Sequence, residues 1–177
     1  MSRIYYPVRF RLDHKERWLL WHTLGDAEGD GADGVVVTQN GKMVVFRSWQ
    51  EMLAYAHAEG LLMAEDDKPA FFDLDVVAKW LGRKRPAKLN CVEFLNAWNL
   101  LADISTSVGG NFDPDKAKTR EIYSKLFWGS NLPAVTPIGR HYTPLWPGRE
   151  SRIIRKVMRE GLALFRRCTV GSQTARQ

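Results

Sequence analysis

The sequence predicts an α+β fold, in which a small antiparallel sheet is followed by helices within one domain spanning residues 1–177. Residues 1–47 contain short runs rich in Val, Tyr and Phe, whereas residues 48–168 show helical periodicity. The two patterns do not alternate along the chain. Alternation would have indicated a parallel sheet with crossover helices.

The first 47 residues are predicted to form an antiparallel meander of about four strands. Residues 3–12 make the first strand, and Pro7 favours an edge position because proline has no backbone donor. Residues 17–24 are apolar enough for a strand that is covered on both faces. Asn40-Gly41 between two Val-rich runs predicts a type I′ hairpin turn, which needs positive φ at both positions.

About five helices are expected after the sheet. Ser48 and Glu51 have capping-box spacing, Asn90 and Glu93 have N-cap spacing, and Asp113 precedes a proline. Asp73 is a further candidate cap. The predicted helices cover residues 48–60, 73–81, 90–109, 113–127 and 148–168, and a flexible tail is expected at 169–177.

Residues 128–147, called here the Pro-rich segment, contain four prolines together with Trp128, Tyr142 and Trp146. One interpretation is packing, in which these aromatics fasten the helices to the body. The other is function, because an ordered segment that exposes Trp and Tyr is a good anchor for a partner. Any of the three that is exposed in the free protein is the first candidate anchor.

The net charge of +6 comes from residues 148–177, which hold eight basic and two acidic residues. Arg152, Arg155 and Arg159 lie with Lys156 and Arg166 on the face of the last predicted helix that is opposite its apolar face. Such a stripe can neutralise phosphates, but it lacks the interleaved aromatics of a single-strand binder. A solvated helix, docking on an acidic protein and nucleic-acid binding all stay open.

The loop after the second predicted strand is acidic. Asp26, Glu28 and Asp30, followed by Gly31, match the start of a calcium-binding loop. However, Val37 occupies the twelfth position, where such a loop needs Glu. The pattern therefore favours a solvated loop or, together with Asp33, an acidic surface that contacts a basic partner.

No catalytic, metal-binding or cofactor-binding motif is recognisable, and no cofactor is expected. The sequence has no Walker motif, dinucleotide fingerprint or nucleophile elbow, and its four histidines lack zinc-site spacing. His141 is kept as the candidate general base of a hydrolase. That role needs a nearby nucleophile or carboxylate, such as Asp113, Glu121 or Ser130.

The sequence also predicts a cytoplasmic protein without a membrane span. No apolar run approaches the length of about 18 residues that a spanning helix needs, and the N-terminus lacks a signal-peptide pattern. Cys91 and Cys168 are far apart and show no metal or redox spacing.

Residues 71–146 also resemble a known family. The stretches that carry the likeness are FFDLDVVAKWL, CVEFLNAWNLLADI, IYSKLFWGSNLPAVTP and HYTPLW. They are similar to small bacterial immunity proteins encoded beside polymorphic and contact-dependent growth inhibition toxins. That family has no catalytic motif, so the resemblance assigns no functional residue.

The resemblance implies a cytoplasmic, non-enzymatic protein that binds one toxin domain, often a nuclease, in a 1:1 complex and masks its active site. The charge departs from the usual pattern, since inhibitors of basic nucleases are usually acidic and this chain is +6. Either the acidic loop makes the contact or the toxin surface is acidic. A nucleic-acid-binding protein that uses the last helix is the alternative, and a hydrolase around His141 is the third.

Overall fold

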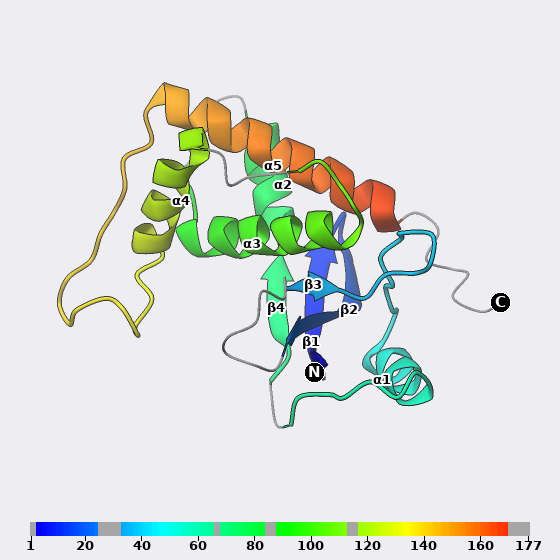
Figure 1. The fold of residues 1–177 in the computed structure, drawn as a ribbon. Coiled ribbons are helices and arrows are strands. Elements are labelled where there is room, and N and C mark those ends of the chain that lie inside the picture. The colour runs from blue at the N-terminus through cyan, green and yellow to red at the C-terminus, as the bar shows by residue number, and fades with distance from the viewer. Residues whose placement is uncertain (1–2, 25–32, 66–67, 84–87, 113–116, 170–177) are drawn as a thin grey trace.

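The computed structural model describes residues 3–24, 33–65, 68–83, 88–112 and 117–169, and within them it confirms the α+β class. Four strands and five helices lie in these residues (Figure 1). They are, in chain order, β1 (Arg3–Leu12), β2 (Lys15–Leu24), β3 (Gly34–Val35), α1 (Trp49–Ala58), β4 (Ala70–Asp73), α2 (Leu74–Gly82), α3 (Cys91–Ser107), α4 (Ala117–Gly129) and α5 (Gly148–Thr169).

The sheet is mixed, and its strand order is β3-β2-β1-β4. β1 and β2 form a long antiparallel hairpin, whereas β4 pairs with β1 in parallel, from Val8 opposite Ala70 to Arg11 opposite Asp73. The prediction of an all-antiparallel meander within residues 1–47 was therefore wrong. Its fourth strand comes from residues that precede α2.

Residues 36–46 do not add two further full strands because they share a single sheet edge. Val36 donates its N–H to the Leu20 carbonyl of β2, while Phe46 exchanges two backbone hydrogen bonds with Trp18 further along the same strand. Each segment therefore pairs with β2 over only a few residues. Within the hairpin between them, Val37 and Met43 form an isolated bridge.

The type I′ turn lies at a different place from the one predicted. Asp13 and His14, between β1 and β2, have φ of 52° and 60°, the two positive values that this turn requires. At Asn40-Gly41 only Gly41 has positive φ, 67°, and its N–H closes a turn on the Thr38 carbonyl. A two-residue Asp-His turn was missed because neither residue is a glycine.

The edge position predicted from Pro7 was also wrong, since β1 is an inner strand. The nitrogen of Pro7 lies toward the β4 side, as does the N–H of Tyr5, because alternate residues of a strand direct their backbone groups to the same side. On that side Tyr5 bonds to Leu62 and Ala64, and β4 begins only at Ala70, opposite Val8. Pro7 thus falls between the two segments that pair with this side of β1.

The helix caps predicted at Ser48 and Asn90 are both present. The Ser48 hydroxyl accepts from the Glu51 N–H at 3.1 Å, and the Asn90 side chain accepts from the Glu93 N–H at 3.4 Å. Asp73 stands at the N-cap of α2, but its carboxylate pairs with Arg11 rather than capping the helix. The predicted cap at Asp113 and most of the predicted tail lie outside the described residues.

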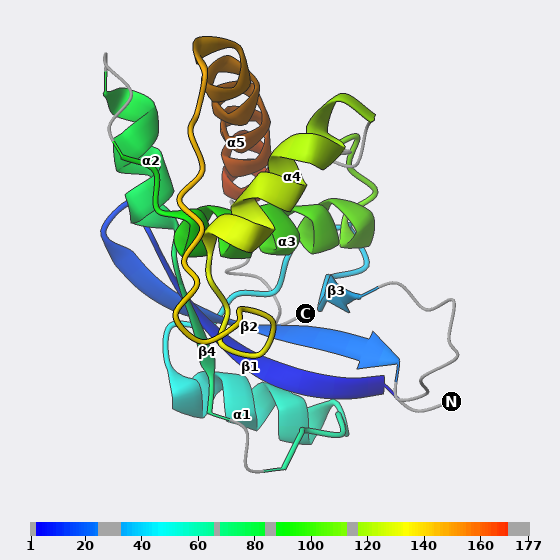
Figure 2. The same cartoon turned by 90° about the vertical axis from the view of Figure 1, so that its left-hand side faces the viewer.

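Helices cover both faces of the sheet (Figure 2). α2, α3, α4 and α5 lie on one side, and α1 lies on the other. β2 is accordingly buried on both faces, as predicted, with Leu19 in the main core and Leu20 in a second core beneath α1. Cys91 and Cys168 are both buried and unpaired. In the described parts of the chain, no helix has the length and apolarity needed to cross a membrane.

Candidate functional site

The Pro-rich segment leaves the end of α4, turns back and runs past α4 to the start of α5 (Figure 1). A Cβ on Gly129 would lie 2.7 Å from both the Cys91 sulfur and the Pro144 ring. Pro144 is buried, and the buried Ser130 hydroxyl donates to the Phe127 carbonyl at 2.6 Å. Close packing therefore fixes the base of the segment.

One side chain also fastens the middle of the segment. The Asn131 amide group donates to the Tyr142 carbonyl at 2.9 Å, and its oxygen accepts from the Tyr142 N–H at 2.8 Å. Asn131 also donates to the Gly129 carbonyl and has φ of 49°, a conformation that asparagine tolerates better than most residues. The segment between Asn131 and Tyr142 is thus a closed loop with a defined shape.

The Pro-rich segment exposes large apolar side chains in this loop and on either side of it. Trp128 is 49% exposed, Tyr142 43% and Leu145 82%. Further exposed members are Leu132, Val135 and Ile138. Trp128 and Tyr142 therefore keep large exposed surfaces, whereas Trp146 is half-buried against the main core.

Trp146 belongs to the connection between α4 and α5. The Lys125 ammonium lies 5.5 Å from the centre of the Trp146 ring, donates to the Leu145 carbonyl and pairs with Glu150 at 2.7 Å. Of the three aromatic anchors predicted from the sequence, Trp128 and Tyr142 are available to a partner and Trp146 is structural.

The basic stripe of α5 is divided by intramolecular contacts. The Arg155 guanidinium lies 4.3 Å from the centre of the Trp80 ring and donates to the carbonyls of Leu81 and Arg83 at the C-terminal end of α2. Arg166 forms two hydrogen bonds with Asp13 in the β1–β2 turn. Arg152 and Arg159 remain exposed. Only part of the stripe is therefore free for phosphates or an acidic partner.

The acidic loop is represented by a single described residue. Asp33 is exposed just before β3, whereas Asp26, Glu28 and Asp30 lie outside the described residues. In the part of the chain that is described, no group of three or more His, Cys, Asp or Glu could hold a metal ion.

His141 is exposed within the Pro-rich segment. None of its described neighbours forms a hydrogen bond or ion pair with the imidazole. Ser130 directs its hydroxyl to the α4 backbone, Glu121 is exposed on α4, and Asp113 is not described. The described geometry therefore offers no activated nucleophile or orienting carboxylate to His141.

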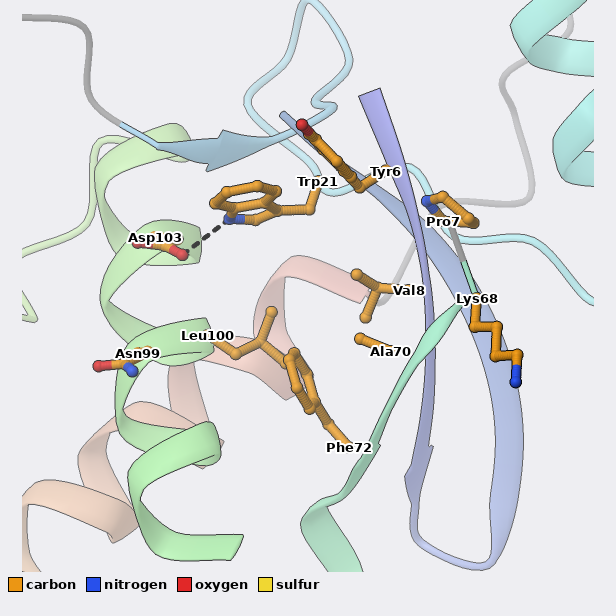
Figure 3. A pocket seen from close by; sticks show the side chains of 10 residues that line it. All are labelled: Tyr6, Pro7, Val8, Trp21, Lys68, Ala70, Phe72, Asn99, Leu100 and Asp103. Carbon is orange, nitrogen blue, oxygen red and sulfur yellow. Dashed lines mark hydrogen bonds between the residues drawn. The ribbon is translucent and has the colours of Figure 1, made fainter. Parts of the chain in front are cut away.

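The structure contains a pocket that the sequence did not indicate. A cavity of about 360 Å³ lies between α3 and the sheet face formed by β1, β2 and β4 (Figure 3). Its lining is mostly apolar, and Asp103 is the acidic residue in it. The lining residues are Tyr6, Pro7, Val8, Trp21, Lys68, Ala70, Phe72, Asn99, Leu100 and Asp103.

Asp103 is held in place by an aromatic side chain rather than by a cation. The Trp21 indole N–H donates to Oδ2 of Asp103 at 2.8 Å. Burial raises the pKa of the Asp103 carboxyl above its ordinary value, the Trp21 hydrogen bond acts against that rise, and nearby Asp33 adds to it. The two residues are 82 positions apart, so no spacing could have revealed the pair. A carboxylate within the otherwise apolar run 100–104 was the one available signal.

The fold and these surfaces define an α+β domain with a mixed four-stranded sheet, a shaped apolar protrusion and an aromatic pocket. No protein-family model matches the chain, and comparisons with curated proteins and with solved structures gave no significant match.

Proposed function

We propose that this chain is a non-enzymatic binding protein of the immunity class, which neutralises a cognate toxin domain by covering its active site. The observation that carries the proposal is the Pro-rich segment, which exposes Trp128, Tyr142 and Leu145 around a closed loop. Contiguous exposed apolar side chains mark interaction sites, and aromatic residues supply much of the binding energy of interfaces.

The shape of the segment supports a protein partner over packing. Prolines and the Asn131–Tyr142 hydrogen bonds hold the loop in one conformation before binding. A loop that is ordered in advance loses little conformational entropy on association, so more of its contact energy contributes to affinity. The resemblance of residues 71–146 to immunity proteins names the class of partner, a single toxin domain that is often a nuclease.

The exposed charges of the chain could face either a basic or an acidic surface on the partner. Asp33 belongs to the acidic loop, while Arg152 and Arg159 remain exposed on α5. Charged residues at the rim of an interface would mainly set the association rate and the choice of partner. The apolar loop would then supply the central contacts.

The proposal is tested by co-expression with the toxin domain encoded directly upstream in the same operon. We expect a 1:1 complex on size-exclusion chromatography and loss of toxicity. The double variant Trp128→Ser and Leu145→Ser should weaken the complex by at least about a hundredfold, since hot-spot truncations each cost about 2 kcal/mol or more. Replacing Leu53, an exposed leucine on α1, with Ser is the control and should leave binding unchanged. Independent elution with toxicity intact would reject the proposal.

A further inference from the structure

We propose that the pocket between α3 and the sheet binds an organic cation, an ammonium or guanidinium group on a short apolar stem. The Asp103 carboxylate is its counter-ion, and Trp21 and Tyr6 form its aromatic wall. This site lies apart from the Pro-rich segment, and its ligand binding does not depend on the proposed toxin partner.

The first support is a carboxylate at a cavity without a cationic partner. Among the described residues, no Lys or Arg lies within ion-pair distance of Asp103. Its one hydrogen bond comes from the neutral Trp21 indole, which leaves Oδ1 without a partner in the described part of the chain. Asp103 is partly buried and its burial opposes ionisation, so a cation bound beside it would offset that cost.

The second support is the aromatic wall. The rings of Trp21 and Tyr6 lie 5.4 Å apart, and Phe72 extends the lining on the β4 side of the cavity (Figure 3). The faces of such rings attract cations, and Trp does so most strongly. Val8, Ala70 and Leu100 complete an apolar surface for the stem of the ligand.

The size and rim of the cavity set the class of ligand. A volume of about 360 Å³ is at the small end of ligand sites and admits a group the size of a Lys or Arg side chain. Lys68 is exposed at the rim, and its ammonium points away from Asp103 (Figure 3). The Asn99 oxygen is occupied by the Tyr123 hydroxyl at 3.0 Å. Asp103 is therefore the group that recognises the positive charge.

The site is tested by NMR on the indole N–H signal of Trp21, assigned with Trp21→Phe. The probes are n-butylammonium, n-butylguanidinium and the neutral analogue n-butanol, each added up to about 20 mM, which nearly saturates a millimolar site. The cations should shift the signal saturably, and n-butanol should bind at least about tenfold more weakly. An equal response to n-butanol, or no saturable shift, would overturn the proposal.

Two variants separate charge from shape. Asp103→Asn keeps an acceptor for the Trp21 N–H but removes the charge, so it should lower cation affinity by at least about tenfold. Glu59→Gln makes the same change at an exposed residue that follows α1, on the other side of the sheet, and should leave binding unchanged. Unchanged affinity in Asp103→Asn would show that the pocket is only an apolar cavity.

The pH dependence of cation binding tests the role of Asp103 in the unmodified protein. Cation affinity should fall as pH is lowered through the titration of Asp103. The described ionisable side chains near Asp103 are those of Asp33, Lys68 and Tyr6, and Asp33 is the other carboxylate among them. Asp33→Asn should keep the pH dependence. If that variant abolishes it, the counter-ion is not Asp103.

A last probe distinguishes whether the cation is a side chain of a partner protein or a small molecule. N-acetyl-lysine N-methylamide carries the Lys side chain as it occurs within a protein. Binding of this compound as well as of n-butylammonium identifies a receptor for a partner's side chain. Binding of the free amines alone identifies a site for a small molecule. Both outcomes support the cation site and differ only in the source of the ligand.

Discussion

At the scale of single residues, carboxylates join parts of the chain that are far apart in sequence. Asp75, at the start of α2, accepts the backbone N–H groups of Asp13 and His14 at 2.8 and 3.0 Å. Asp13 in turn pairs with Arg166 near the end of α5. The tight β1–β2 turn, with its two positive φ values, is thus stabilised by α2 and α5.

Two carboxylates are expected to affect stability with opposite signs. The hydrogen bond from Arg11 lowers the pKa of Asp73, whereas burial raises the pKa of Asp103. Ionised Asp73 therefore stabilises the fold above the ordinary Asp pKa, and this contribution is lost as pH falls through its lowered value. Ionisation of Asp103 instead opposes folding once pH rises above the ordinary value.

We therefore predict that replacing Asp73 or Asp103 with asparagine changes the midpoint of thermal unfolding differently at pH 7. Asp73→Asn should lower the midpoint of thermal unfolding, and Asp103→Asn should leave it unchanged or raise it. Both differences from the unmodified protein should shrink as pH falls toward 3, because the carboxyls then become protonated. Calorimetry across this pH range checks the prediction. A lower midpoint for Asp103→Asn at pH 7 would show that the charged hydrogen bond to Trp21 outweighs the cost of burial.

At the scale of elements, α5 crosses α3 at a residue without a side chain. A Cβ on Gly161 would lie 2.6 Å from a methyl carbon of Leu101 and 3.2 Å from its Cβ. Leu101 is fully buried, so it has little room to move. The close approach of these helices requires glycine at this position.

We therefore expect Gly161→Ala to destabilise the fold by about 1–3 kcal/mol, although alanine favours helix by about 1 kcal/mol. Chemical denaturation measures the change. Gly148→Ala is a matched control in the same helix, because a Cβ there has no neighbour within 4 Å. The control should be neutral or slightly stabilising. Equal behaviour of the two variants would mean that the helix crossing is not closely packed at Gly161.

A second contact between elements explains why the basic stripe is not uniform. Arg155 covers the Trp80 ring and donates to carbonyls at the C-terminal end of α2. Arginine is suited to this role because its planar group can stack on a ring and donate several hydrogen bonds at once. Its charge is thus used for the attachment of α2 to α5, whereas Arg152 and Arg159 are exposed.

At the scale of the whole molecule, the Pro-rich segment lies outside the two cores. The main core lies between the sheet and α2–α5, and the second lies between the sheet and α1. Residues 132–141 contribute no buried side chain to either core. Most of this segment should therefore be dispensable for folding.

The prediction is that replacing residues 132–141 with a short Gly-Ser linker between Asn131 and Tyr142 keeps the fold. The midpoint of thermal unfolding should change by no more than about 4 °C, which corresponds to about 1 kcal/mol in a domain of this size. The same variant should bind the toxin domain more weakly, because it lacks the exposed Leu132, Val135 and Ile138 but keeps Trp128, Tyr142 and Leu145. A large loss of stability would instead show that the segment fastens the helices to the body.

Local signals predicted much of the fold but little of the pocket. The caps at Ser48 and Asn90 and the doubly covered strand β2 were predicted correctly, since each depends on neighbouring residues or on the periodicity of one element. The exposure of Trp128 and the pairing of Trp21 with Asp103 were not predictable. They depend on which elements pack together.

The sequence by itself determined the class, α+β, and the main helical stretches, because capping and hydrophobic periodicity act within a few residues. Only the tertiary structure decided that Ala70–Asp73 would pair with β1. Val-rich residues 36–46 share one edge of β2, so they do not supply the fourth strand of the sheet. The tertiary structure also decided which basic side chains of α5 are exposed and which are held by contacts within the chain. The free energy of a contact between distant residues depends on the packing of the whole chain, and no local pattern records it.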